Sequence, residues 1–184
     1  MHTARLVLVA ILFAATLVAQ QPGSSKANGP MSNFTLASPA FPSGAAIPDR
    51  FTCQGTDDSP ALVWTGHPAQ ATSFALIVDD PDASAGTWVH WVMWNIPSSS
   101  HLSPANVART ASLADGTIQG RNSFGKIGYN GPCPPPGKTH RYFFRLYALD
   151  TKLALQPGAT RKELDAAMKG HILGTTVHMG TYRR

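Results

Sequence analysis

The stretch SFALIV at residues 73–78 is apolar at nearly every position and is followed at once by DDPDAS at residues 79–84. A short apolar run that ends in an Asp-Pro turn is typical of a strand buried on both faces. The next run, VHWVMWNI at residues 89–96, is also apolar on both faces. We therefore expect two buried strands here, with the second lying between two sheets.

Further β-type runs lie on both sides of this stretch, separated by turn residues. The chain has 16 Gly and 15 Pro, and only 14% of its residues are charged, which favours many short elements over long surface helices. These features predict a mostly β protein with two antiparallel sheets packed as a β-sandwich. The predicted strands are residues 34–36, 50–52, 61–64, 73–78, 89–96, 141–149 and 176–182.

One segment predicts a C-terminal helix. Thr160 and Glu163 have the spacing of a capping box, in which each side chain satisfies a free backbone N–H. Leu164, Ala167 and Met168 then form an apolar stripe at helical spacing. We expect this helix to pack on the edge of a sheet.

The N-terminal part has the pattern of an export signal. Arg5 precedes an apolar run over residues 6–18, which is shorter than the roughly 20 residues that span a bilayer. We predict a signal peptide over residues 1–20, a flexible lead over 21–33 and a domain over 34–184. The mature protein would be periplasmic or secreted, without a transmembrane segment after cleavage; a membrane anchor is the alternative.

Charge and cysteine content narrow the functions further. The formal net charge is +5, but Lys and Arg do not cluster, so nucleic-acid binding is not expected. Cys53 and Cys133 are the two cysteines of the chain, and in an oxidising compartment they predict one disulfide. Two buried free thiols near a pocket are the alternative.

Two polar clusters interrupt the apolar pattern. The first is the acidic turn with Asp79, Asp80 and Asp82, followed by Trp88 and His90. Taken alone, it is also explained by a solvated turn. The second is a rigid segment, GPCPPPG at residues 131–137, which we call the proline loop. It leads to His140 and could equally be a stiff surface crossover.

Together these clusters resemble the phosphatidylethanolamine-binding protein family, also called Raf kinase inhibitor proteins, and its shorter bacterial branch in particular. The resemblance extends to FTCQG at 51–55, SPALVW at 59–64 and the ending GHILG at 170–174, so it covers residues 34–184. It implies a β-sandwich with a small cavity that holds phosphate-like or carboxylate anions. The ligand-binding residues that it implies are Asp80, Trp88, His90, Gly131, Pro134, Pro135, His140 and Tyr142.

The chain departs from the family pattern at two positions, since Ser84 stands where relatives often have proline and Cys133 interrupts the run of prolines. Two imidazoles, a phenol and backbone N–H groups suit an anion because they supply converging donors. Asp80 would accept a hydrogen bond from the far nitrogen of a histidine and so favour the imidazolium.

The leading hypothesis is non-enzymatic binding of a small anion, such as phosphate, a phosphomonoester or a phospholipid head group. The alternative is an inhibitor or scaffold for a protein partner such as an extracytoplasmic serine protease. A hydrolase is less expected because the usual nucleophile and metal motifs are missing from the sequence. A free Cys133 beside His140 would be the candidate nucleophile. We expect no cofactor and no bound metal.

Overall fold

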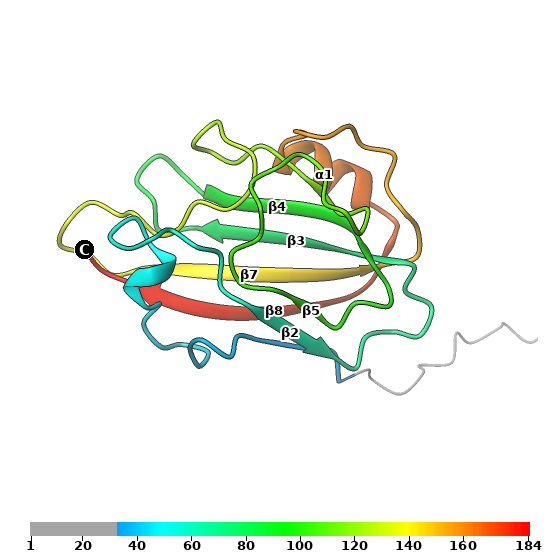
Figure 1. Ribbon diagram of the computed structural model, residues 1–184, viewed down its shortest axis with the longest axis horizontal. Helices are drawn as coiled ribbons and strands as arrows, with labels where there is room; N and C mark the ends of the chain where they lie inside the picture. Colours follow the sequence, from blue (N-terminus) through cyan, green and yellow to red (C-terminus); the bar gives the residue numbers. More distant parts are fainter. Residues whose placement is uncertain (1–32) are drawn as a thin grey trace, which may run out of the picture. The chain divides into compact units, whose positions relative to one another are not determined.

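Two antiparallel sheets enclose the main core of the computed structural model, which describes residues 33–184. One sheet has three strands in the order β1-β2-β5, and the other has five in the order β6-β4-β3-β7-β8 (Figure 1). The predicted mostly β, two-sheet fold with one helix near the C-terminus is confirmed. The elements are β1 (Thr35–Ala37), the 3-10 helix η1 (Asp49–Phe51), β2 (Leu62–Thr65), β3 (Ser73–Asp80), β4 (Trp88–Pro97), β5 (Leu102–Ser103), β6 (Ile118–Gln119), β7 (His140–Leu149), α1 (Arg161–Met168) and β8 (Ile172–Tyr182).

The central strand β3 is buried on both faces. Phe74, Leu76 and Val78 point into the core between the sheets, whereas Ala75 and Ile77 belong to a second cluster on the outer face. Side chains alternate along a strand, so a strand covered on both faces has an unbroken apolar sequence. This explains the run at residues 73–78.

Strand β7 follows the same alternation next to β3. Phe144 and Leu146 lie in the core between the sheets, and Tyr142 lies on the same face two residues earlier. His140 continues this series at the start of the strand, where it is buried. The inner face of β7 therefore changes from apolar to polar at its first residues.

A β-bulge re-aims the start of β4. Val78 pairs with Trp91, but the next pair joins Asp79 to Val89, so His90 has no partner across the ladder. A bulge places an extra residue on one strand and turns its side chain. As a result, His90 lies 5.2 Å, ring centre to ring centre, from Tyr142 on the inner face.

Helix α1 begins at the predicted capping box, which is confirmed. The N–H of Thr160 donates to the Glu163 carboxylate at 2.7 Å, and the Glu163 N–H donates to the Thr160 hydroxyl at 3.4 Å. Leu164 and Met168 are buried against the outer-face residues of β3 and β4. The helix therefore covers the outer face of the large sheet rather than its edge.

Most predicted strands are confirmed with ends that differ by one or two residues, but two predictions differ more from the structure. Residues 50–52 were expected to form a strand, but residues 49–51 form η1, because the N–H of Phe51 turns back to the carbonyl of Pro48 at 2.9 Å. The Thr52 hydroxyl also donates to the Asp49 carbonyl at 2.9 Å. The last strand starts at Ile172, before the predicted residue 176.

The predicted signal peptide, residues 1–20, and all but the last residue of the predicted lead lie outside the described residues. Within residues 33–184, no helix is long and apolar enough to cross a membrane.

Candidate functional site

A cavity of about 210 Å³ lies where β3 ends and β4 and β7 begin. These strands are antiparallel neighbours, so the end of β3 and the starts of β4 and β7 meet at one end of the sheet. The acidic turn, the proline loop and Phe124 complete the wall. The lining residues are Asp80, Ala83, Ser84, Ala85, Trp88, His90, Phe124, Cys133, Pro134, Pro135, His140 and Tyr142. Every predicted ligand-binding residue except Gly131 is among them.

Asp80 and His140 form a buried pair in this wall. Nδ1 of His140 lies 2.8 Å from Oδ2 of Asp80. The other oxygen, Oδ1, accepts from the backbone N–H of Asp82 at 2.8 Å. This arrangement holds the proton on Nδ1 and leaves Nε2 of His140 without a hydrogen bond to residues 33–184.

His90 is oriented by the backbone instead of by a carboxylate. Its Nδ1 lies 2.6 Å from the carbonyl oxygen of Asn130, which can only accept, so Nδ1 carries the proton. The residue is 2% exposed, and burial lowers its pKa, although the Asn130 carbonyl and the charge of Asp80 oppose this effect. The free protein therefore holds His90 neutral at pH 7, with its Nε2 available.

Tyr142 contributes a hydroxyl that makes no hydrogen bond of normal length and angle to the described residues, although the Asp80 carboxylate lies near it. The residue is 1% exposed, and burial together with the charge of Asp80 raises its pKa. The hydroxyl thus keeps its proton as a donor. A buried donor without a partner is unfavourable, so its place in a cavity wall points to a ligand atom or a water as its acceptor.

The three carboxylates of the acidic turn have different partners. Asp79 faces the outer side of the sheet, where Arg145 and Arg161 contact it at 3.2 and 2.5 Å. Asp82 receives two hydrogen bonds from the guanidinium of Arg141, which holds the pKa of this carboxyl at about 2. Asp80 is therefore the one carboxylate of the turn that faces the cavity.

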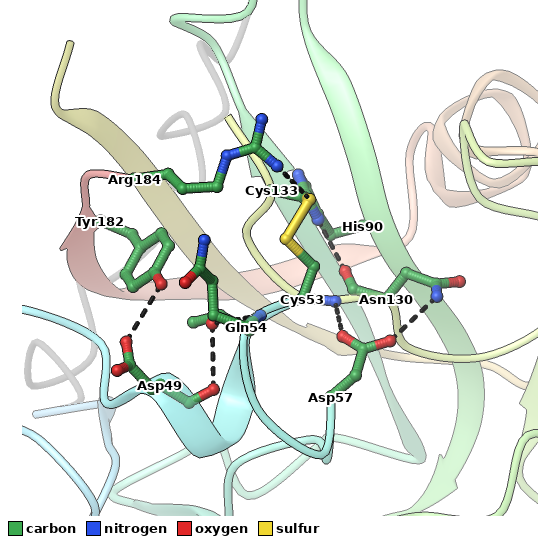
Figure 2. Close-up of a disulfide and its surroundings, with 11 residues drawn as sticks. Asp49, Cys53, Gln54, Asp57, His90, Asn130, Cys133, Tyr182 and Arg184 are labelled. Atoms are coloured by element: carbon green, nitrogen blue, oxygen red, sulfur yellow. Dashed lines mark hydrogen bonds between the residues drawn. A yellow bond between two sulfur atoms is a disulfide. The ribbon is translucent and has the colours of Figure 1, made fainter. Parts of the chain in front are cut away.

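The proline loop is held by residues 51–57, the end of η1 and the turn after it, which we call the clamp segment. Cys53 and Cys133 form a disulfide between the two segments, with Cα atoms 5.4 Å apart. Figure 2 shows this disulfide. Beside it, the Cys53 N–H donates to the carbonyl of Pro132 at 3.1 Å. The predicted disulfide is present, and it joins the cavity wall to a segment 80 positions away.

Gly131 helps to hold the proline loop against the clamp segment and does not line the cavity. Its N–H donates to Oδ1 of Asp57 at 2.6 Å, so it is not available to a ligand. A Cβ at this position would lie 2.1 Å from the carbonyl oxygen of Phe51. Glycine is required here because the two backbones approach so closely.

Three residues of the site, Phe124, Asn130 and Asp57, were not predicted from the sequence. Phe124 forms edge-to-face contacts with Trp88 and His90 at 5.5 and 5.4 Å, and 38% of it is exposed. A large aromatic residue in a polar turn is the signal that could have identified it. Asn130 and Asp57 act through contacts between distant segments, for which the local pattern holds no signal.

Within residues 33–184, no group of three or more His, Cys, Asp or Glu side chains is arranged to hold a metal ion.

Comparison with known proteins agrees with this architecture. The family model described as phosphatidylethanolamine-binding protein matches residues 37–183. A UPF0098 protein of Methanothermobacter thermautotrophicus is 52% identical over 151 residues, which are 82% of this chain and 99% of the relative. A UPF0098 protein of Pyrococcus abyssi is 47% identical over 150 residues, which are 80% of this chain and 84% of the relative.

Two solved structures share the fold. One, from Chlamydia trachomatis, is described as a homolog of phosphatidylethanolamine-binding proteins; it is 38% identical with a TM-score of 0.76 and covers 83% of this chain and 99% of its own. The other, Escherichia coli YBCL, is 32% identical with a TM-score of 0.77 and covers 82% and 98%. The family model, the relatives and the shared fold together show that the chain belongs to the phosphatidylethanolamine-binding protein family.

Proposed function

We propose that the cavity binds a small anionic group, such as phosphate, a phosphomonoester or a phospholipid head group, without catalysing a reaction on it. The observation that carries the proposal is the buried Tyr142 hydroxyl, which makes no hydrogen bond of normal length and angle to residues 33–184. His90 and His140 line the same cavity with Nε2 atoms that make no hydrogen bond to the described protein. The Tyr142 hydroxyl can donate to a ligand oxygen as it stands, and an Nε2 of the same cavity becomes a donor when its imidazole is protonated.

The negative charge of Asp80 does not oppose this function. Both of its oxygens already accept hydrogen bonds, from His140 Nδ1 and from the Asp82 N–H. The Asp80 carboxylate orients the His140 ring through Nδ1 and leaves Nε2 for the ligand. An anion would therefore meet His140 rather than Asp80.

The size of the cavity selects the head group over the rest of a lipid. Its volume of about 210 Å³ is below the roughly 300–1,000 Å³ of pockets that enclose drug-sized ligands. A phosphate group fits within such a volume, whereas acyl chains would remain outside. Recognition would rest on the anion and on the aromatic rim formed by Trp88 and Phe124.

Calorimetric titration with phenyl phosphate tests the proposal. We expect Tyr142→Phe to weaken binding about tenfold or more, because a hydrogen bond to a charged group contributes about 1.5–3 kcal/mol. Tyr182→Phe is the matched control, since the Tyr182 hydroxyl donates to Asp49 and does not line the cavity. Wild-type protein that binds no phenyl phosphate, or two variants that weaken binding equally, would overturn the proposal.

Two further ligands distinguish the sources of the anion. Inorganic phosphate reports on the anion alone, whereas glycerophosphoethanolamine reports on a lipid head group. Tighter binding of the second would assign the site to lipid head groups, and equal binding would assign it to phosphate in general.

The alternative functions have less support. Cys133, the candidate nucleophile of a hydrolase, is in the disulfide and has no free thiol. Inhibition of an extracytoplasmic serine protease stays a prediction, and titration against a panel of such proteases tests it.

We also infer that the protein is exported. The disulfide supports this inference because disulfides persist in oxidising compartments. Cell fractionation, with N-terminal sequencing of the mature protein, would detect cleavage after residue 20.

A further inference from the structure

A single peptide group connects the Asp57 carboxylate to the His90 imidazole. On one side, the N–H of Gly131 donates to Oδ1 of Asp57 at 2.6 Å. On the other side, the carbonyl of Asn130 accepts from Nδ1 of His90 at 2.6 Å. Both groups belong to the peptide between Asn130 and Gly131, and Figure 2 shows Asp57, Asn130 and His90 around it.

We propose that Asp57 is a positioning residue of the anion site, which acts on His90 through the peptide group between Asn130 and Gly131. This inference rests on the proposed function of the cavity. A carboxylate bound to a peptide N–H polarises the group, so its carbonyl becomes a stronger acceptor. The stronger acceptor holds the proton on Nδ1 of His90 and turns Nε2 to the ligand. The two histidines are then supported alike, His140 directly by Asp80 and His90 through one peptide by Asp57.

The other side-chain contacts of Asp57 are made with Asn130 and Arg109. Its Oδ2 accepts from the side-chain amide of Asn130 at 3.1 Å, so the carboxylate binds both residues of that peptide. Arg109 donates to Oδ2 at 2.8 Å and also to the Asp57 backbone carbonyl. The side-chain oxygen of Asn130 in turn accepts from Asn122 at 2.9 Å, which fixes the direction of its amide. Because the direction of the Asn130 amide is fixed, its oxygen acts as an acceptor and its nitrogen as a donor in this network.

The backbone of Asp57 supplies an independent observation. Its φ is +60°, in the left-handed region, which is costly for a residue with a side chain. Conformations of this kind persist where surrounding contacts hold them, and they concentrate at functional sites. Glycine would adopt this φ without cost, but it could not reach the Gly131 N–H.

The charges around His90 agree with the proposed direction of the effect. Burial lowers its pKa most, whereas the Asn130 carbonyl and the charges of Asp80 and Asp57 raise it. Tyr142 faces the ring from β7 and is uncharged because its pKa is raised, and His140 of the same strand lines the same cavity. Loss of the Asp57 charge should therefore lower the pKa of His90.

Imidazole ¹⁵N spectra of the ligand-free protein test the relay, with Asp57→Asn as the main variant. An asparagine can still accept from Gly131, but its amide would face two other donors, on Asn130 and Arg109. We expect the Nδ1–H form of His90 to become less populated and its pKa to fall. Sulfate affinity at pH 6 should decrease about tenfold, which corresponds to about 1.4 kcal/mol.

Asp58→Asn is the matched control. Asp58 is the next residue, and its carboxylate pairs with Arg50, away from the proline loop. We expect its His90 signals to match those of wild type and its sulfate affinity to stay within about twofold. A folded Asp57→Asn protein with the His90 signals and affinity of wild type would overturn the inference.

Arg109→Gln keeps the inference testable if Asp57→Asn does not fold. Without the guanidinium, the Asp57 charge is less compensated, so the pKa of His90 should rise, opposite to the effect of Asp57→Asn. A His90 pKa that changes in the same direction in both variants, or that is unchanged in Arg109→Gln, would reject the relay. If wild-type protein binds no anion, the proposed function fails, whereas the ligand-free spectra still decide the relay.

Discussion

Nδ1 of His140 lies 2.8 Å from Oδ2 of Asp80, although 60 positions separate the two residues in the chain. Both side chains are almost fully buried. Each satisfies the other, so removal of either leaves a polar group without a partner in a place that water reaches poorly. The pair therefore serves both the stability of the sheet end and the orientation of the site.

Asp80→Asn should lower the free energy of unfolding by about 1–3 kcal/mol, because the buried hydrogen bond from His140 Nδ1 loses its charged acceptor. Urea denaturation measures this loss. Asp82→Asn is the control, since Asp82 pairs with the exposed Arg141, and its cost should stay below about 1 kcal/mol. Equal costs for the two variants would contradict the role given to Asp80.

Stability should decrease as the pH falls below about 6.5, the ordinary pKa of histidine. Burial lowers the pKa of His90 and of His178 in the folded protein, so the unfolded chain binds protons more readily between pH 6.5 and the folded-state values. Urea denaturation between pH 5 and 7.5 would reveal this slope. His90→Gln and His178→Gln should each flatten it, and an unchanged slope in both would refute the assignment.

Anion affinity should show the opposite dependence on pH. Sulfate, whose charge is constant in this range, should bind at least about fivefold more tightly at pH 5.5 than at pH 8, because the imidazolium is the better donor. Calorimetry of wild type and His90→Gln measures this difference. The variant should lose most of it, and equal affinity of wild type at both pH values would argue against the two imidazoles as ligands.

Removal of the disulfide should cost about 4 kcal/mol of stability, since it closes a loop of 80 residues in the unfolded chain. The double variant Cys53→Ser, Cys133→Ser in urea gives the value. Ligand affinity should fall as well, because Cys133 lines the cavity. A variant with full affinity would show that the backbone bonds of the clamp segment suffice to hold the wall.

Local patterns predicted much of the fold. The double burial of β3 explains its unbroken apolar run, and the capping box at Thr160 and Glu163 marks the start of α1 because both partners lie within one turn. The strand predicted at residues 50–52 was wrong because Phe51 is apolar but reaches the core from a helical turn.

The site was predictable where family resemblance covers it and obscure where it depends on distant contacts. Asp80, His90, His140 and Tyr142 line the cavity as the motifs implied. Gly131, in contrast, donates to Asp57 across 74 positions, and His90 reaches the inner face through a bulge. Neither the long-range bond nor the extra residue of the bulge leaves a periodic mark in the sequence.

The neighbours Asp79 and Asp80 leave β3 on opposite sides, one toward the arginines near α1 and one toward the cavity. A slip of β3 by one residue against β7 would exchange them, so that each carboxylate met the wrong environment. Both changes would be unfavourable, because the guanidinium groups on one side and the imidazole on the other would lose their carboxylate partners. The dipeptide whose second carboxylate lines the cavity would thus also favour the observed alignment of the central strands.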